Sequence, residues 1–150
     1  MSIKFVPQHD KMDCGPSCLV MICNFYGKKY TLQFFRDNSY ITREGVSLLG
    51  LSEAAESVGL KTLSTKLSIE ELILKKDTLP CIIHWNKNHF VVLNKIKKRI
   101  FSKKKIFQIA DPAYGIINLS QDNFKNHWIS DDNGSIALLF FLQKSSTIKL

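Results

Sequence analysis

The segment from Cys81 to Ile96, CIIHWNKNHFVVLNKI, contains two apolar runs separated by the polar turn Asn86-Lys87-Asn88. Runs of β-branched and aromatic residues bounded by turn residues are typical of strands, so we expect strands over Cys81–Trp85 and His89–Ile96. The same pattern recurs downstream and predicts three more strands: Ile106–Ala110, Ile116–Leu119 and Ser135–Leu142. The last part of the chain is therefore expected to form an antiparallel sheet.

Helical signals dominate the first two thirds of the chain. A helix is expected over Cys14–Tyr26, since Pro16 lies in its first turn and Gly27 follows its end. Shorter helices are expected after Thr31, which can cap a helix N-terminus, from near Ser47 to Gly59, and after Ser68, which forms a capping box with Glu71. In the last third of the chain, Ser120 is expected to cap one further short helix, which ends near Trp128. Helices first and antiparallel strands afterwards indicate an α+β domain.

Length and composition indicate one domain spanning residues 1–150. The chain has 45% hydrophobic and 23% charged residues, close to globular averages, and no repeat or linker divides it. Its longest apolar run, Ile136–Leu142, has seven residues, whereas a membrane helix needs about 20. Residues 1–10 lack the apolar stretch of a secretory signal. These features favour a cytosolic domain.

The net charge of +8 is concentrated in one place. Seven of the 21 lysines and arginines lie between Lys95 and Lys105, where the strand pattern predicts a turn. Such a run usually forms a solvated loop, and neither an interleaved aromatic pattern nor a known nucleic-acid-binding motif accompanies it. We therefore expect no nucleic-acid partner.

The cysteines are expected to be reduced. Cys14 and Cys18 are four residues apart on one expected helix, which holds their Cβ atoms about 5–6 Å apart, farther than the roughly 3.5–4.5 Å of a disulfide. We predict no metal and no cofactor. A metal site formed by His9, Cys14 and Cys18 is the alternative, with an unconventional ligand spacing.

Cys14 has the sequence context of a reactive thiol. It opens a predicted helix, whose unpaired N–H groups and positive dipole end favour the thiolate over the thiol. Gly15 leaves space beside the sulfur. The alternative is a buried structural cysteine, and this description suits Cys18, Cys23 and Cys81.

His89 and Asp111 are candidates to assist Cys14. A thiol nucleophile needs a base within hydrogen-bond reach and a third group that orients the base. His89 starts one predicted strand, and Asp111 follows the next, which Pro112 ends. If these strands pair as a hairpin, the start of one lies beside the end of the other, so His89 and Asp111 become neighbours. Each alone could be an ordinary turn residue, but their placement at one edge favours a Cys-His-Asp site.

Three blocks of sequence together resemble a known family: Gln8-x5-Cys14-Gly15-Pro16, His89-Phe90-Val91-Val92-Leu93 and Ala110-Asp111-Pro112-Ala113-x-Gly115. They are similar to the double-glycine leader peptidase domain, a papain-like cysteine peptidase at the N-terminus of ABC transporters that export bacteriocins and related peptides. The resemblance extends from Gln8 to about Phe141. It implies a papain-like fold in which N-terminal helices precede an antiparallel sheet.

The resemblance implies a role for each matching residue. Cys14 would be the nucleophile, His89 the general base and later the acid, and Asp111 the group that orients the imidazole. The Gln8 side-chain amide and the Cys14 backbone N–H would form the oxyanion hole. A polar, uncharged donor before the nucleophile suits a developing oxyanion.

The implied substrate is a precursor peptide whose amphipathic leader helix ends in Gly-Gly and is cut after the second glycine. Family leaders dock in a hydrophobic groove, and Leu63 and Leu67 are candidates for its wall, although their alternation with polar residues also fits an ordinary half-buried strand. The implied partners are the membrane and ATPase domains of a parent ABC transporter, with this domain on the cytosolic side of the inner membrane. A stand-alone peptidase is the alternative, because these residues contain neither a membrane helix nor a phosphate-binding G-x-x-x-x-G-K-[ST] loop.

Other functions stay open. A non-catalytic domain that only docks its export substrate would lack the nucleophile, whereas Cys14, His89 and Asp111 are all present. Another Cys-His-Asp enzyme, an amidase or an acyltransferase, would use the same residues. The basic segment Arg99–Lys105 is longer than the family's usual turn. It could contact an acidic leader, anionic lipid or the rest of the transporter, or it could be a solvated hairpin tip.

Overall fold

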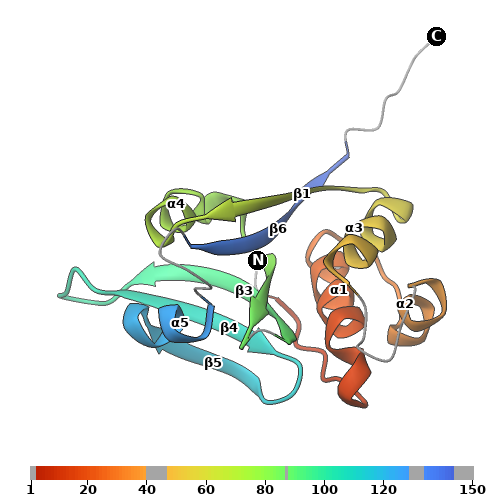
Figure 1. Ribbon diagram of the computed structural model, residues 1–150, viewed down its shortest axis with the longest axis horizontal. Coiled ribbons are helices and arrows are strands. Elements are labelled where there is room, and N and C mark those ends of the chain that lie inside the picture. Colours follow the sequence, from red (N-terminus) through yellow and green to blue (C-terminus); the bar gives the residue numbers. More distant parts are fainter. Residues whose placement is uncertain (1–2, 40–46, 87, 129–133, 144–150) are drawn as a thin grey trace, which may run out of the picture.

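The computed structural model describes residues 3–39, 47–86, 88–128 and 134–143 (Figure 1). Its helical segments are η1 (Lys11–Asp13), α1 (Cys14–Phe25), α2 (Leu32–Asn38), α3 (Leu48–Ser57), α4 (Ile69–Leu74), η2 (Lys76–Thr78) and α5 (Gln121–Trp128), where η marks a 3₁₀ turn. Its strands are β1 (Leu60–Leu67), β2 (Cys81–Trp85), β3 (His89–Lys98), β4 (Lys105–Asp111), β5 (Gly115–Ser120) and β6 (Ser135–Leu142). None of the helices in these ranges combines the length and the apolar character needed to cross a bilayer.

Side-chain caps set the starts of the shorter helices. Three hydroxyls each accept a hydrogen bond from the backbone N–H three residues later: Thr31 from Phe34 at 3.0 Å, Ser47 from Gly50 at 3.0 Å, and Ser68 from Glu71 at 3.1 Å. At the start of α5, the Ser120 hydroxyl accepts from the Asn123 N–H at 3.3 Å. These bonds satisfy donors that a helix start leaves unpaired. The predicted helix starts are confirmed.

Within the described residues the strands form one six-stranded antiparallel sheet in the order β1-β6-β2-β3-β4-β5. Strands β3 and β4 form the expected hairpin, with Val92 opposite Ala110 and Lys98 opposite Lys105. The last strand, β6, returns to lie between β1 and β2. The α+β class, with helices packed on an antiparallel sheet, is confirmed.

Strand β1 departs from the simple order of helices first and strands afterwards. It lies between α3 and α4 in the chain and pairs along its whole length with β6, from Leu60 opposite Leu142 to Leu67 opposite Ser135. Only its two end residues are buried. The segment in which Leu63 and Leu67 alternate with polar residues is therefore an edge strand, and most of its residues are not buried.

Alternate residues of the central strands pack on opposite faces of the sheet. Ile82 and Val92 belong to a core cluster with residues of α1, α2 and α3, whereas their neighbours Ile83 and Val91 belong to a second cluster with residues of α4 and α5. Figure 1 shows α1, α2 and α3 grouped together at one end of the molecule. Burial of each such side chain contributes roughly 1.5–3 kcal/mol. This packing fixes α1 against β3, which positions the start of the helix.

Candidate active site

Cys14 is the first residue of α1, as expected. It is 9% exposed. The chain enters the helix through the 3₁₀ turn η1, which the sequence did not predict. In this turn Met12 N–H donates to the Asp10 carboxylate at 2.8 Å, and Asp10 N–H donates to the Asp13 carboxylate at 3.2 Å. The thiol thus lies at the positive end of a helix whose start is held by these hydrogen bonds.

An ion pair holds the residue before Cys14. Asp13 is fully buried, and its Oδ1 lies 3.1 Å from Nε of Arg36 on α2. Nη2 of the same arginine lies 3.5 Å from Oδ2 of Asp10. A buried carboxylate requires such a partner, so Arg36 of α2 stabilises the turn η1, which directly precedes Cys14. Arg36 is not predictable from the sequence, because no local pattern pairs it with Asp13.

His89 and Asp111 meet as the hairpin predicts. His89 begins β3, Asp111 ends β4, and His89 Nε2 donates a hydrogen bond to Asp111 Oδ1 at 2.6 Å. The carboxyl group is 3% exposed, and the same oxygen accepts a second bond from the Ala113 N–H at 2.9 Å. These bonds hold the carboxylate and the imidazole in one orientation. Because Nε2 is bonded to Asp111, Nδ1 is the ring nitrogen left for Cys14.

The charge on His89 follows from its neighbours. Burial lowers its pKa, but hydrogen bonds with the Asp111 and Cys14 side chains and their negative charges outweigh burial and raise the pKa from 6.5 to about 9. The imidazole is therefore protonated at neutral pH. A protonated imidazole beside a thiolate is a suitable resting state for a cysteine nucleophile.

The other cysteines have the surroundings of structural residues. Burial raises the pKa of Cys23 and of Cys81 to about 12. Burial also raises the pKa of Cys18 far above its usual range, and the negative charges of Cys14 and Asp111 raise it further. All four thiols are free, in agreement with the spacing argument. Across the described ranges, no group of three His, Cys, Asp or Glu side chains is arranged to hold a metal ion.

An open cleft of about 550 Å³ lies beside His89 and Asp111, and Gln8 forms part of its wall. The Gln8 backbone N–H donates to the Pro112 carbonyl at 3.0 Å, which ties the N-terminal segment to the turn after β4. Its side-chain Oε1 is buried and has no hydrogen-bond partner among the described residues. The amide is thus close to the His–Asp pair and has bonding capacity that the protein does not use.

The two groove candidates on β1 have different surroundings. Leu63 is 52% exposed, whereas Leu67 is 2% exposed and packs in the same core cluster as Ile69 and Leu72 of α4. The structure therefore corrects the predicted pair. Leu67 is a core residue, because the chain turns into α4 directly after it, and Leu63 alone offers a surface to a ligand.

A thiol at a helix N-terminus, close to a hydrogen-bonded His–Asp pair at the ends of two antiparallel strands, is the arrangement of a cysteine peptidase of the papain-like class. The chain belongs to the peptidase C39 family, whose model matches residues 2–133. The resemblance carried by the three sequence blocks is confirmed, and so is the assignment as a cysteine peptidase domain.

Curated relatives are much longer than this chain. It is 32% identical over 126 residues to the colicin V secretion/processing ATP-binding protein CvaB of Escherichia coli, covering 84% of this chain and 17% of that protein. It is 33% identical over 129 residues to the lactococcin-G-processing and transport ATP-binding protein LagD of Lactococcus lactis subsp. lactis. This match covers 83% of this chain and 18% of that protein. The chain thus spans less than a fifth of the length of the relatives it matches.

Solved structures have the same fold. A double glycine motif protease from an AMS/PCAT transporter, in complex with the leader peptide, superposes with a TM-score of 0.81 at 30% identity, covering 94% of this chain and 92% of that one. The peptidase domain of Streptococcus ComA superposes with a TM-score of 0.78 at 26% identity. This superposition covers 94% of this chain and 99% of that domain. The papain-like peptidase fold is therefore established over nearly the whole chain.

Proposed function

We propose that Cys14, His89 and Asp111 form the catalytic triad of this peptidase. The observation that carries the proposal is that His89 donates a hydrogen bond to Asp111 at 2.6 Å, while Cys14, at the start of α1, is close enough to the imidazole for its negative charge to help raise the pKa of His89. The nucleophile, the base and the orienting group are thus connected in the order that such catalysis requires.

The reaction proceeds by acyl transfer through a thioester. The Cys14 thiolate attacks the scissile carbonyl carbon, and the C–N bond of the tetrahedral intermediate then breaks as protonated His89 gives its proton to the leaving amine. Neutral His89 next takes a proton from water, which attacks the thioester. Collapse of the second intermediate releases the carboxylic acid and restores the thiolate beside protonated His89. Asp111 stays ionised and orients the imidazole.

We assign the oxyanion hole to the Gln8 side-chain amide and the Cys14 backbone N–H. Gln8 lines the cleft beside His89, and its backbone N–H bond to the Pro112 carbonyl holds it next to Asp111. An amide donor directed at the carbonyl oxygen stabilises the negative charge that develops on it in the transition state. The positive end of α1 adds to this stabilisation.

We propose that the substrate is a precursor peptide cut after the Gly-Gly that ends its leader. Supporting this, one similar structure is a double glycine motif protease in complex with the leader peptide, and the relatives are named for processing as well as transport. Leu63, exposed on β1, is the proposed contact for an amphipathic leader helix.

We further propose that the chain acts as the peptidase part of an ABC exporter, on the cytosolic side of the inner membrane. In this arrangement cleavage is coupled to export by membrane and ATP-binding domains. The names of the relatives, which describe secretion or transport ATP-binding proteins, support this placement.

A cleavage assay tests the proposed function. A synthetic peptide with a leader ending in Gly-Gly and several core residues should be cut once, after the second glycine, as read by mass spectrometry. Cys14→Ala and a peptide with Ala-Ala in place of Gly-Gly should give no product. Cys18→Ala, the same substitution one turn further along α1, should leave cleavage intact because Cys18 is buried.

The other outcomes of this assay separate the alternatives. Binding of the leader without any cleavage would contradict the peptidase proposal and favour a docking domain. Cleavage that ignores the Gly-Gly pair would contradict the proposed specificity and favour another Cys-His-Asp amidase or acyltransferase.

A further inference from the structure

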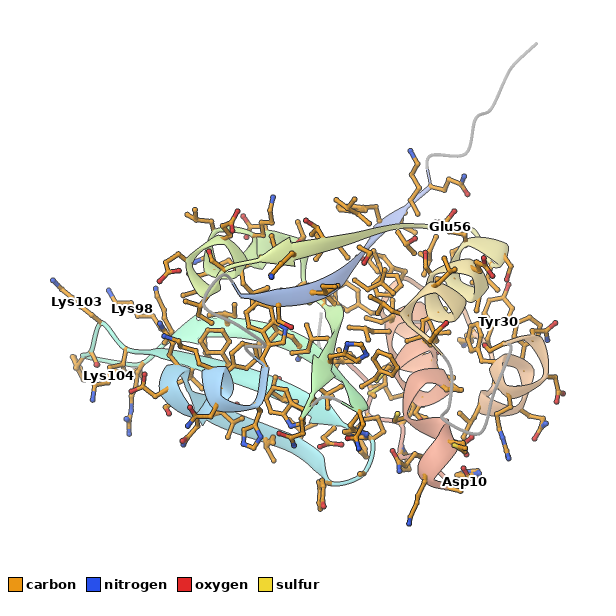
Figure 2. All side chains as sticks on the ribbon, viewed as in Figure 1. Asp10, Tyr30, Glu56, Lys98, Lys103 and Lys104 are labelled. Atoms are coloured by element: carbon orange, nitrogen blue, oxygen red, sulfur yellow. The ribbon has the colours of Figure 1, made fainter. Side chains whose placement is uncertain are left out.

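The end of the β3–β4 hairpin far from His89 is strongly basic, and we call residues 95–105 the basic tip. It contains seven cations and no acidic residue: Lys95, Lys97, Lys98, Arg99, Lys103, Lys104 and Lys105. All of them except Lys105 are exposed. Figure 2 shows Lys98, Lys103 and Lys104 spread around the projecting tip, far from Asp10 beside the start of α1. Among the described residues no carboxylate forms an ion pair with any of these cations.

Two large apolar side chains form the apex of the basic tip. Ile100 is 79% exposed and Phe101 is completely exposed. The turn that carries them is closed by hydrogen bonds from Ser102 N–H to the Arg99 carbonyl at 3.2 Å and from Arg99 N–H to the Lys104 carbonyl at 2.9 Å. These backbone hydrogen bonds therefore present both side chains to solvent.

Two features of the basic tip oppose its own stability. Phe101 has a φ of +60°, in the left-handed region that bulky residues rarely adopt. Lys98 lies directly opposite Lys105 in the strand register, and like charges at such a pair repel each other. Neither the positive φ of Phe101 nor the Lys98/Lys105 pair stabilises the hairpin. A binding role of the tip therefore explains the presence of these residues better than a role in folding does.

We propose that the basic tip binds an anionic membrane surface. An apolar apex followed by a ring of cations is the arrangement of segments that lie in the lipid interface: the apolar side chains enter the boundary of the acyl chains, and the cations contact the lipid headgroups. A nucleic acid could stack on Phe101, but it offers no apolar layer to Ile100. The charge and the exposed apolar area together therefore favour lipid.

Membrane contact at the basic tip would leave the active site accessible. His89 and Asp111 lie at the opposite end of the same two strands, and the nine-residue rise from His89 to Lys98 corresponds to about 30 Å of extended chain. The tip could thus anchor the domain while the cleft faces the cytosol. This inference does not depend on the identity of the peptide substrate.

Vesicle binding tests the proposal. The purified 150-residue chain should co-sediment with vesicles that contain phosphatidylglycerol and phosphatidylcholine, and not with phosphatidylcholine alone, and high salt should release it. In the variant Phe101→Trp, tryptophan emission should shift to the blue on addition of the anionic vesicles. The native Trp85 and Trp128 are 4% and 2% exposed, so their emission provides a constant background.

Matched variants separate a specific tip contact from net charge. Lys103→Glu with Lys104→Glu, and Ile100→Ser with Phe101→Ser, should each weaken binding to anionic vesicles at least about tenfold. Lys29→Glu with Lys61→Glu changes the net charge by the same amount at two exposed lysines outside the tip, and it should change binding by less than about threefold. Cleavage of a leader peptide in solution should be unchanged in the tip variants, which shows that they are folded.

Three results would overturn the proposal. The first is that the wild-type chain does not bind anionic vesicles, and the second is that the Lys29→Glu/Lys61→Glu control loses as much vesicle affinity as the tip variants do. The third is that the chain binds a DNA duplex more tightly than vesicles at the same salt concentration. None of these results bears on leader cleavage, which is measured separately.

Discussion

The two ends of the β3–β4 hairpin are built from the same pair of strands and have opposite electrostatic character. At one end His89 and Asp111 are largely removed from solvent, and each is hydrogen-bonded to a defined partner. At the other end six of the seven cations of the basic tip are exposed, and none has a carboxylate partner among the described residues. A bulge between Leu93 and Lys95 separates the two ends.

The difference shows how one hairpin can support two kinds of interaction. Charges that are partly buried interact strongly, because little water screens them, whereas exposed charges are screened within about 10 Å at ordinary salt. The end with the His–Asp pair can therefore hold a fixed geometry and a shifted pKa. The basic tip can attract a charged surface without affecting the chemistry. Substitutions at the two ends should accordingly have very different effects on cleavage.

Replacing His89 with alanine should have the largest effect on cleavage. Loss of the base removes proton transfer and the partner of the thiolate, so kcat/KM should fall by about 1,000-fold or more. His9→Ala is the matched control, because His9 is exposed and lies outside the proposed triad, and it should retain activity. Steady-state kinetics on a leader peptide gives both values. A loss of less than tenfold in His89→Ala would contradict the proposed base.

Replacing Gln8 with alanine should lower kcat about 100- to 1,000-fold and leave KM nearly unchanged. The reason is that an oxyanion donor acts mainly in the transition state, where its loss costs about 2.7–4 kcal/mol. Measurement of kcat and KM separately checks this split. A rise in KM with kcat unchanged would assign Gln8 to substrate binding instead.

Replacing Asp111 with asparagine should shift the pH dependence of cleavage. In the wild type, His89 loses its proton at about pH 9, so kcat/KM should decline above that pH. The asparagine variant lacks the carboxylate charge, so the high-pH decline should move downwards, and kcat/KM at pH 8 should fall by tenfold or more. An unchanged profile would contradict the role of Asp111.

The same pair contributes to folding stability with a defined sign. Because the pKa of His89 is raised from 6.5 to about 9 in the folded protein, its stabilising contribution is fully present below about pH 6.5 and is lost as the pH rises through about 9. Urea unfolding of wild type and Asp111→Asn at pH 6 and pH 9.5 should show a larger difference at pH 6.

Shortening the basic tip should have the smallest effect on cleavage. Replacing residues 99–104 with Asn-Gly would close the strands with a two-residue turn suited to a hairpin. Because the removed residues lie at the far end from His89, kcat/KM in solution should stay within about twofold of wild type. A tenfold loss in a folded variant, judged by circular dichroism, would show that the two ends of the hairpin are coupled.

Features set by local chemistry were predictable from the sequence. Thr31, Ser47 and Ser68 cap helices because a hydroxyl reaches an N–H three residues later, whatever the rest of the fold does. The juxtaposition of His89 and Asp111 was also predictable, since consecutive strands joined by a turn usually pair as a hairpin.

Features that depend on distant parts of the chain were not predictable. Strand β1 pairs with the last strand, β6, and no local signal encodes a partner so far away. The burial of Leu67 follows from the packing of α4, and the Asp13–Arg36 ion pair follows from the docking of α2 on the turn before Cys14. Such contacts depend on the tertiary arrangement, so a single sequence leaves them open.

The most direct test of the proposed nucleophile is covalent trapping. A leader peptide ending in a Gly-Gly chloromethyl ketone should alkylate one of the four free cysteines, and peptide mapping by mass spectrometry identifies which one. We predict a single adduct on Cys14, formed much more slowly in His89→Ala. An adduct on Cys18, Cys23 or Cys81, or an equal rate in His89→Ala, would contradict the assignment of Cys14 and His89 as the catalytic pair.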